Sequence, residues 1–141
     1  MSKTIYSIYD NSPKTEQIST LLGQNNTAKI QLSGLVGSSI SFLIRSLFKK
    51  SELPFVLILN DKEEAAYFLN DLEQMVGDQD VLFYPASFRR PYQIEETDNA
   101  NVLLRAEVLN RINSRKKPAI IVSYPEALFE KVVTRKELDK N

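Results

Sequence analysis

The residues with the most recognisable chemical spacing run from Gly34 to Ser41 and read Gly-Leu-Val-Gly-Ser-Ser-Ile-Ser. A phosphate-binding P-loop has the form G-x-x-x-x-G-K-[ST], in which the lysine reaches the phosphates and the hydroxyl holds Mg²⁺. In this frame Gly34 and Ser41 fit, but Ser39 replaces the second glycine and Ile40 replaces the lysine. Isoleucine carries no charge, and serine lacks the freedom of glycine at positive φ. The sequence therefore predicts a degenerate phosphate loop with no catalytic residue, made of Gly34, Gly37, Ser38, Ser39, Ile40 and Ser41.

Two interpretations of this loop remain open. The free N–H groups at a helix N-terminus bind anions, so the loop could retain weak phosphate binding. Alternatively, the loop is a relic turn in which Gly34 and Gly37 are kept because they fit tightly between a strand and a helix.

A second candidate site is an aromatic and basic group of residues in a predicted loop, Pro85 to Thr97. Two adjacent guanidinium groups beside aromatic rings suit phosphates, base stacking or a carboxylate on a partner. The predicted contact residues, for a protein partner or DNA, are Phe88, Arg89, Arg90 and Tyr92. The alternative is a solvated loop that the two aromatic rings hold in place.

The acidic clusters have a structural explanation. Asp61, Glu63 and Glu64 begin a predicted helix, where carboxylates cap free N–H groups and complement the helix dipole. Glu95, Glu96 and Asp98 are interpreted in the same way, so no metal site is predicted. The run 115–117, Arg-Lys-Lys, is interpreted as a solvated loop.

Composition excludes several function classes. The chain of 141 residues has no cysteine and no histidine, which removes disulfides, thiolate zinc sites, cysteine nucleophiles and histidine-based triads. Lysine plus arginine and aspartate plus glutamate both number 18, and this zero net charge argues against a domain whose main task is wrapping nucleic acid. The sequence shows neither a signal peptide nor an apolar run of membrane-spanning length, so we expect a cytoplasmic protein with no membrane partner.

Alternating strands and helices should position these groups. The predicted strands are 29–33, 55–59, 81–84 and 119–122, and the unbroken apolar run 55–59 is typical of a strand buried on both faces. Helices are predicted at 16–23, 37–49, 62–76, 97–114 and 125–132, and residues 5–9 could form a short helical face. For the helix 97–114 the apolar spacing predicts an inward face of Val102, Leu103, Ala106, Leu109 and Ile112.

This order predicts an α/β fold with three layers, α/β/α, around a mostly parallel sheet. We expect a helical extension at 1–27, the α/β domain at 28–132, and at 133–141 the start of a connection to a following domain that this chain lacks. Thr134 to Glu137 has the form of a capping box, so a helix begins just before the chain ends.

Several segments, in this order and spacing, resemble the N-terminal domain of bacterial transcription-repair coupling factors (Mfd), which is similar to the first domain (1a) of the excision-repair protein UvrB. The segments are 32–38, 57–61 followed by Ala65 and Ala66, 83–85 through 91–92, 105–111 and 120–128. The resemblance covers about Ile30 to Leu128. It departs from UvrB in two places: Ile40 replaces the P-loop lysine, and 85–97 is too short for the damage-probing hairpin of UvrB.

The resemblance implies a non-catalytic interaction and regulatory module, without a cofactor of its own, in transcription-coupled nucleotide excision repair. The full-length family is implied to be an ATP-dependent DNA translocase that displaces stalled RNA polymerase and recruits UvrA, with ATP and Mg²⁺ in its motor domains. The expected partners are the other domains of the same protein and, through the full-length protein, UvrA and RNA polymerase. Two alternatives stay open: a weakly DNA-binding module that uses Arg89 and Arg90, or a weak nucleotide-binding domain.

Overall fold

A small, all-parallel sheet forms the centre of the computed structural model, which describes residues 2–24, 27–87 and 99–130. Its strands are β1 (Phe55–Ile58), β2 (Val81–Phe83) and β3 (Ile120–Ser123), in the order β1-β3-β2. Phe55 and Val81 both pair with Ile120, so the register places the three strands side by side. The prediction of an α/β fold with a parallel sheet is confirmed.

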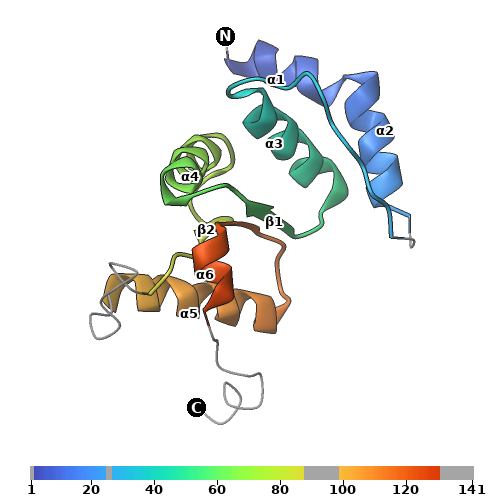
Figure 1. Cartoon of the computed structure of the whole chain (residues 1–141). Coiled ribbons are helices and arrows are strands. Elements are labelled where there is room, and N and C mark those ends of the chain that lie inside the picture. The colour runs from blue at the N-terminus through green and yellow to red at the C-terminus, as the bar shows by residue number, and fades with distance from the viewer. Residues whose placement is uncertain (1, 25–26, 88–98, 131–141) are drawn as a thin grey trace.

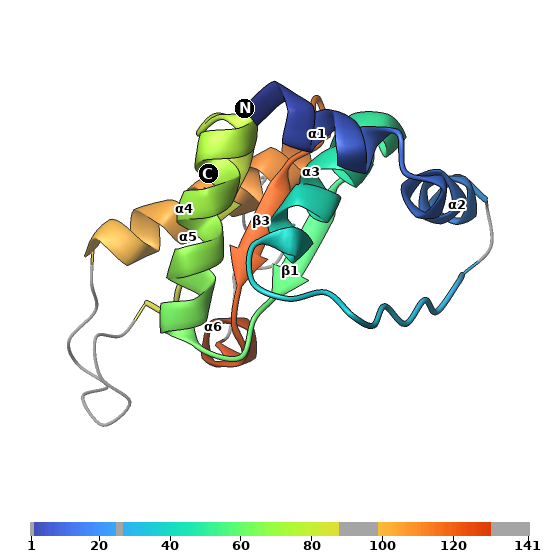
Figure 2. The same cartoon turned by 90° about the horizontal axis from the view of Figure 1, so that it is seen from above.

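Helices lie on both sides of the sheet (Figure 1). On one side are α3 (Ser39–Ser51) and α4 (Lys62–Val76), which pack against each other and lie side by side in Figure 2. On the other side are α5 (Asn99–Ser114) and the short α6 (Pro125–Phe129). This arrangement is consistent with three α/β/α layers.

The buried core forms where α4 meets β2 and β3. Leu72 of α4 has no exposed surface, and every residue of β3 is buried. A strand buried on both faces must be apolar, and β3 reads Ile-Ile-Val-Ser. Its serine is accommodated because Ser123 Oγ donates a hydrogen bond to the Tyr84 carbonyl at 2.8 Å.

The two N-terminal helices, α1 (Ser2–Asp10) and α2 (Pro13–Leu22), pack on α3 rather than on the sheet. Tyr9 stacks on Phe42, with ring centroids 5.4 Å apart. Asp10 accepts hydrogen bonds from Ser46 Oγ at 2.6 Å and from Arg45 at 3.3 Å. These contacts explain why α3 buries polar residues on the side that faces away from the sheet.

The predicted strand at 29–33 is wrong. These residues are exposed and form no strand, and they belong to an extended connection that crosses from α2 to α3 outside the sheet (Figure 2). Alternating Ile30 and Leu32 gave the strand pattern, but a strand needs a neighbour for its backbone hydrogen bonds and a surface for its apolar face. The helix that follows begins at Ser39, two positions later than the predicted start at Gly37.

Two predicted burial patterns are also wrong. β1 alternates between half-buried and exposed residues, because it lies at the edge of the sheet and α5 packs against β2 instead. In α5 the buried residues are Arg105 and Val108, whereas Val102, Leu103, Ala106 and Ile112 are exposed. Helical spacing of apolar residues could not identify this face, because such a pattern predicts that an arginine is exposed to solvent.

Leu72→Ala tests the position of the core. Removing a fully buried leucine side chain leaves a cavity, so we expect the free energy of unfolding to fall by about 2–5 kcal/mol. Leu103→Ala is the matched control, because Leu103 is 71% exposed, and its effect should stay within about 0.5 kcal/mol. Urea unfolding followed by circular dichroism measures both, and equal effects would contradict this packing.

Candidate functional site

The backbone of the degenerate loop has the left-handed turns that glycine allows. Gly34 has φ of 80° and Gly37 has φ of 56°. A Cβ atom added at either glycine would meet nothing within 4 Å. The interpretation that these glycines fit tightly between a strand and a helix is therefore wrong, and the residues are suited to the loop by their backbone conformation.

The hydroxyl of Ser39 closes the loop on itself. Ser39 Oγ accepts a hydrogen bond from the Val36 N–H at 2.8 Å and donates one to the Val36 carbonyl at 2.7 Å. Ser38, the residue before α3, makes no side-chain cap. The serine that replaces the second glycine of a P-loop thus stabilises the local turn.

Ser41 lies in the place of the magnesium-binding hydroxyl, and its side chain is fully buried in the packing of α3. Its Oγ has no hydrogen-bond partner among the described residues. Ile40, in the place of the lysine, is partly exposed and apolar. The loop therefore lacks the charge and the accessible hydroxyl of a nucleotide site, and residues 27–33 before it form no strand.

The aromatic and basic candidate, Phe88, Arg89, Arg90 and Tyr92, lies outside the described residues. The segment just before it, residues 84–87, follows the carboxyl end of β2, the edge at which open α/β sheets place their sites. The position of residues 84–87 is fixed by contacts that the structure does describe.

The centre of those contacts is Arg105, which sequence reasoning did not select. Its Nη1 donates to the carbonyls of Pro85 at 2.9 Å and Ala127 at 3.0 Å, and it lies 3.2 Å from the Glu130 carboxylate. Its Cζ stacks 4.2 Å from the centroid of the Tyr84 ring. A buried guanidinium group thus joins the end of β2 to α6.

A second set of bonds holds the same segment. Glu130 accepts hydrogen bonds from the N–H of Ser87 at 2.9 Å and from its hydroxyl at 2.8 Å. Tyr124 Oη accepts one from the Ala86 N–H at 2.8 Å, and Asn101 donates to the Ala86 carbonyl at 3.0 Å. This network positions the backbone, and its ionic groups are paired with each other. Arg105 and Glu130 are too far apart in the sequence for a motif to link them.

Burial raises the pKa of two tyrosines in this network. For Tyr84, loss of water around the hydroxyl raises the pKa above its ordinary value of 10.0, and the positive charge of Arg105 opposes the change. For Tyr124 burial again raises the pKa, and the hydrogen bond from Ala86 opposes it. Both hydroxyls therefore stay protonated at neutral pH.

The acidic cluster at the start of α4 caps the helix, as predicted. Asp61 accepts a hydrogen bond from the Glu64 N–H at 2.8 Å, and Glu64 accepts one from the Asn60 N–H at 3.0 Å. Within the described ranges, no group of three or more acidic, histidine or cysteine residues is placed to hold a metal ion. None of the helices in these ranges combines the length and the hydrophobicity that crossing a bilayer requires.

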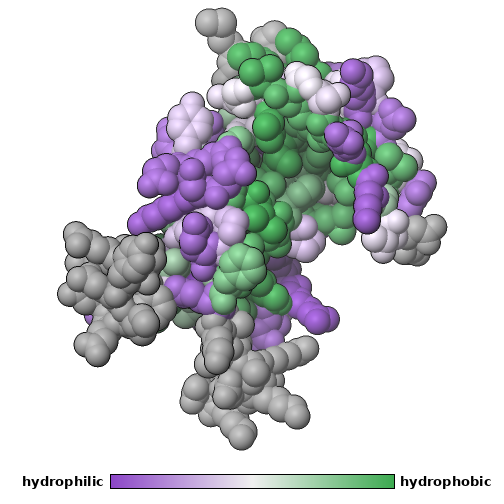
Figure 3. Space-filling model, viewed as in Figure 1, coloured by the Kyte–Doolittle hydropathy of each residue, from purple (hydrophilic) through white to green (hydrophobic). Residues whose placement is uncertain are grey.

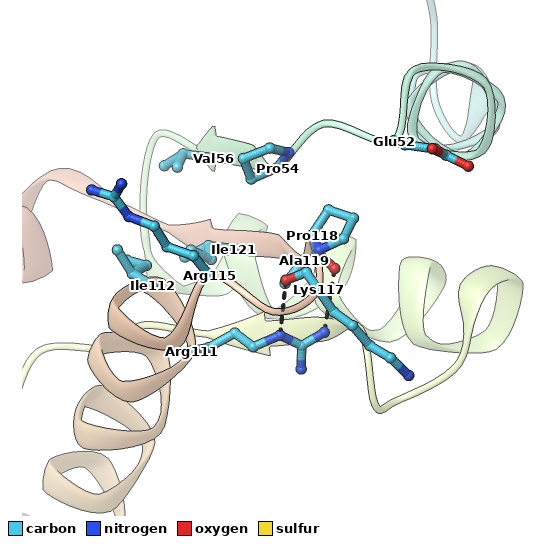
Figure 4. A pocket seen from close by; sticks show the side chains of 10 residues that line it. All are labelled: Glu52, Pro54, Val56, Arg111, Ile112, Arg115, Lys117, Pro118, Ala119 and Ile121. Atoms are coloured by element: carbon cyan, nitrogen blue, oxygen red, sulfur yellow. Dashed lines mark hydrogen bonds between the residues drawn. The ribbon is translucent and has the colours of Figure 1, made fainter.

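A hollow of about 530 Å³ lies on the opposite side of the sheet from α4, at the amino ends of β1 and β3 (Figure 4). It lies between β1 and the carboxyl end of α5. Its lining is mostly apolar with basic groups at the rim, and consists of Glu52, Pro54, Val56, Arg111, Ile112, Arg115, Lys117, Pro118, Ala119 and Ile121. The run 115–117, predicted to be a solvated loop, is exposed and borders this hollow.

Comparison with known proteins gives a similarity to a bacterial repair protein. The chain is 26% identical over 92 residues to the transcription-repair-coupling factor of Rickettsia bellii (strain RML369-C). The match covers 64% of this chain and 8% of that protein, so the chain spans only a small part of the relative. No protein-family profile matches the chain, and no solved structure matches it. The similarity supports a relationship to transcription-repair coupling factors.

The loop geometry gives a first prediction for this site. Because Ile40 carries no charge and Ser41 is buried, calorimetric titration with Mg-ATP and Mg-ADP should give no saturable heat at millimolar nucleotide. The Ile40→Lys variant restores the missing charge and should remain without binding, since the hydroxyl is still inaccessible. Saturable binding by the unaltered chain would show that its backbone alone forms a nucleotide site.

The two buried tyrosines predict a loss of stability in alkali. A hydroxyl whose pKa is raised by folding stabilises the native state fully below the unfolded value, near 10, and this contribution is lost as the pH rises through the folded value. Tyr84→Phe should therefore reduce the fall in unfolding free energy above pH 10, whereas Tyr67→Phe, at an exposed position, should not. Urea unfolding at a series of pH values measures this, and identical profiles would contradict it.

Proposed function

We propose that this chain is a non-catalytic interaction and regulatory module of a transcription-repair coupling factor that acts in transcription-coupled nucleotide excision repair. The observation that carries the proposal is the similarity over 92 residues to a protein of that name. We further propose that this module forms the N-terminal, UvrB-like part of the coupling factor.

The geometry of the degenerate loop supports the non-catalytic part of the proposal. A P-loop that has lost its lysine and buried its hydroxyl keeps only the turn, and the turn is closed by Ser39 on Val36. The chain also has no cysteine or histidine, the two residue types that most often supply a nucleophile or a general base. In this proposal, the role of α1, α2 and the network around Arg105 is to stabilise the fold of the module, and they take no part in a reaction.

The activities of the whole protein lie outside this module in our proposal. ATP-dependent DNA translocation, displacement of stalled RNA polymerase and recruitment of UvrA belong to other parts of the full-length coupling factor. This module contacts those parts and restrains them in the resting protein. Such a role requires a stable surface, which the packed core provides.

Strand-specific repair tests the proposed function. In cells that encode this chain, disruption of its gene should slow the removal of ultraviolet photoproducts from the transcribed strand of an active gene to the rate of the other strand. A restoring copy that carries Ser41→Ala should recover the difference between strands, because the buried hydroxyl has no hydrogen-bond partner among the described residues and, in this proposal, binds no phosphate. An unchanged strand difference after disruption would refute the role in transcription-coupled repair, and failure of a folded Ser41→Ala copy would refute its non-catalytic character.

A further inference from the structure

The open edge of β1 is a place where the fold is incomplete. The sheet order puts β1 at an edge, and no described strand pairs with its outer side. Phe55 and Leu59 donate their N–H groups to the carbonyls of Ala119 and Ser123 on β3, at 3.0 Å and 2.9 Å. Because backbone groups alternate between the two edges of a strand, the N–H and carbonyl groups of Val56 and Ile58 point to the open side.

The side chains of the same two residues are uncovered. Val56 is 56% exposed and Ile58 is 60% exposed. In the space-filling view, apolar side chains gather in the centre of the face around β1, with hydrophilic residues at its margins (Figure 3). An exposed apolar edge strand tends to pair with another chain, and proteins usually block it with charge, proline or a covering segment. β1 itself has none of these devices, since it reads Phe-Val-Leu-Ile.

The hollow beside β1 favours a partner that carries negative charge. Val56 and Ile121 line it from the sheet and Ile112 lines it from α5, so its floor is apolar (Figure 4). Arg115 and Lys117 stand at its rim, and among the described residues neither side chain takes part in an ion pair. Arg111, in contrast, is paired with Asp80 at 2.7 Å. The unpaired cations outnumber Glu52, the one carboxylate in the lining, so the rim favours an anionic partner.

We propose that the edge of β1 and its adjoining hollow bind an extended segment of a partner protein that carries alternating apolar residues flanked by acidic residues. The segment adds as a further strand to β1, through backbone hydrogen bonds to Val56 and Ile58. Its apolar side chains cover these two residues and enter the hollow, and its carboxylates pair with Arg115 and Lys117. This is strand addition to a sheet edge, in which main-chain bonds give affinity and side-chain pockets give specificity.

The assignment rests on the proposed role of the chain as an interaction module, and it names the chemistry of one partner. It also makes the surface distinct from the degenerate loop, because none of the loop residues 34–41 lines the hollow. The two proposals are therefore tested by different experiments. The repair experiment tests the role in transcription-coupled repair whichever surface the module uses, and the peptide experiments below test the surface at β1.

Fluorescence anisotropy with two labelled peptides tests this surface. The acidic probe is E-E-V-S-V-S-V-E-E, and the basic control K-K-V-S-V-S-V-K-K has the same apolar pattern. The whole chain should bind the acidic probe at least about tenfold more tightly than the basic one, and the preference should shrink as salt is raised. Absence of saturable binding, or equal binding of the two probes, would overturn the proposal.

Ile58→Pro separates strand addition from simple apolar contact. Its N–H points away from β3, so proline removes no bond of the existing sheet, and edge strands tolerate proline at such positions. The variant should keep the circular dichroism of the parent chain and lose at least about tenfold in affinity for the acidic probe. Ile58→Ala, which keeps the N–H, should lose less. Equal losses for the two variants would mean that no strand is added.

Charge reversal tests the rim. Arg115→Glu combined with Lys117→Glu should reverse the preference in favour of the basic probe. The matched control, Lys14→Glu combined with Lys62→Glu, changes the net charge equally at exposed positions outside the hollow and should keep the preference. Light scattering identifies the alternative occupant: a dimer that Ile58→Pro abolishes would assign the edge to a second copy of this chain and overturn the acidic partner.

Discussion

The structure depends on the hydrogen bonding of β3 from both sides. β3 is the one described strand with a neighbour at each edge, and all four of its residues are buried. A buried backbone must have its polar groups paired, so β3 can be buried only because β1 and β2 form hydrogen bonds with its two edges. The helices then follow, because the faces of β2 and β3 are apolar and have to be covered. α4 covers β2 and β3 on one side, and α5 contacts β2 on the other.

Arg105 shows how a charged group can belong to the interior. The side chain is buried, and its Nη1 has two carbonyl acceptors and one carboxylate nearby. Removal of any of these partners would leave a charge with poor solvation, since a buried ion is stable only when it is paired and hydrogen-bonded. The ends of β2 and β3 and the short α6 are therefore held together by one guanidinium group. The consequence for function is a fixed geometry at the carboxyl edge of the sheet.

The uncovered side of β1 differs from the Arg105 network because its residues are apolar and exposed. α5 lies over β2, so the apolar residues of β1 on that face remain in contact with water. At the carboxyl edge Arg105 is paired with Glu130, although its buried Nη2 has no hydrogen-bond partner among the described residues. At the edge of β1, backbone groups have no partner strand among the described residues, and an apolar hollow lies beside them. A module that works by contact needs a surface of this second kind, because burial of exposed apolar side chains and pairing of free backbone groups both favour association.

The sequence by itself determined the class of fold and the absence of the lysine that a P-loop requires. Apolar runs at 55–59, 81–84 and 119–122, separated by helical periodicity, identified the three strands and their helices, and Ile40 alone identified the missing charge. These features are local, so spacing and residue type are sufficient to predict them. Only the tertiary structure decided which face of α5 is buried, that 29–33 forms no strand, and that β1 lies at an edge. Each of these depends on which distant segment supplies a backbone partner or covers an apolar face, and neither periodicity nor propensity contains that information.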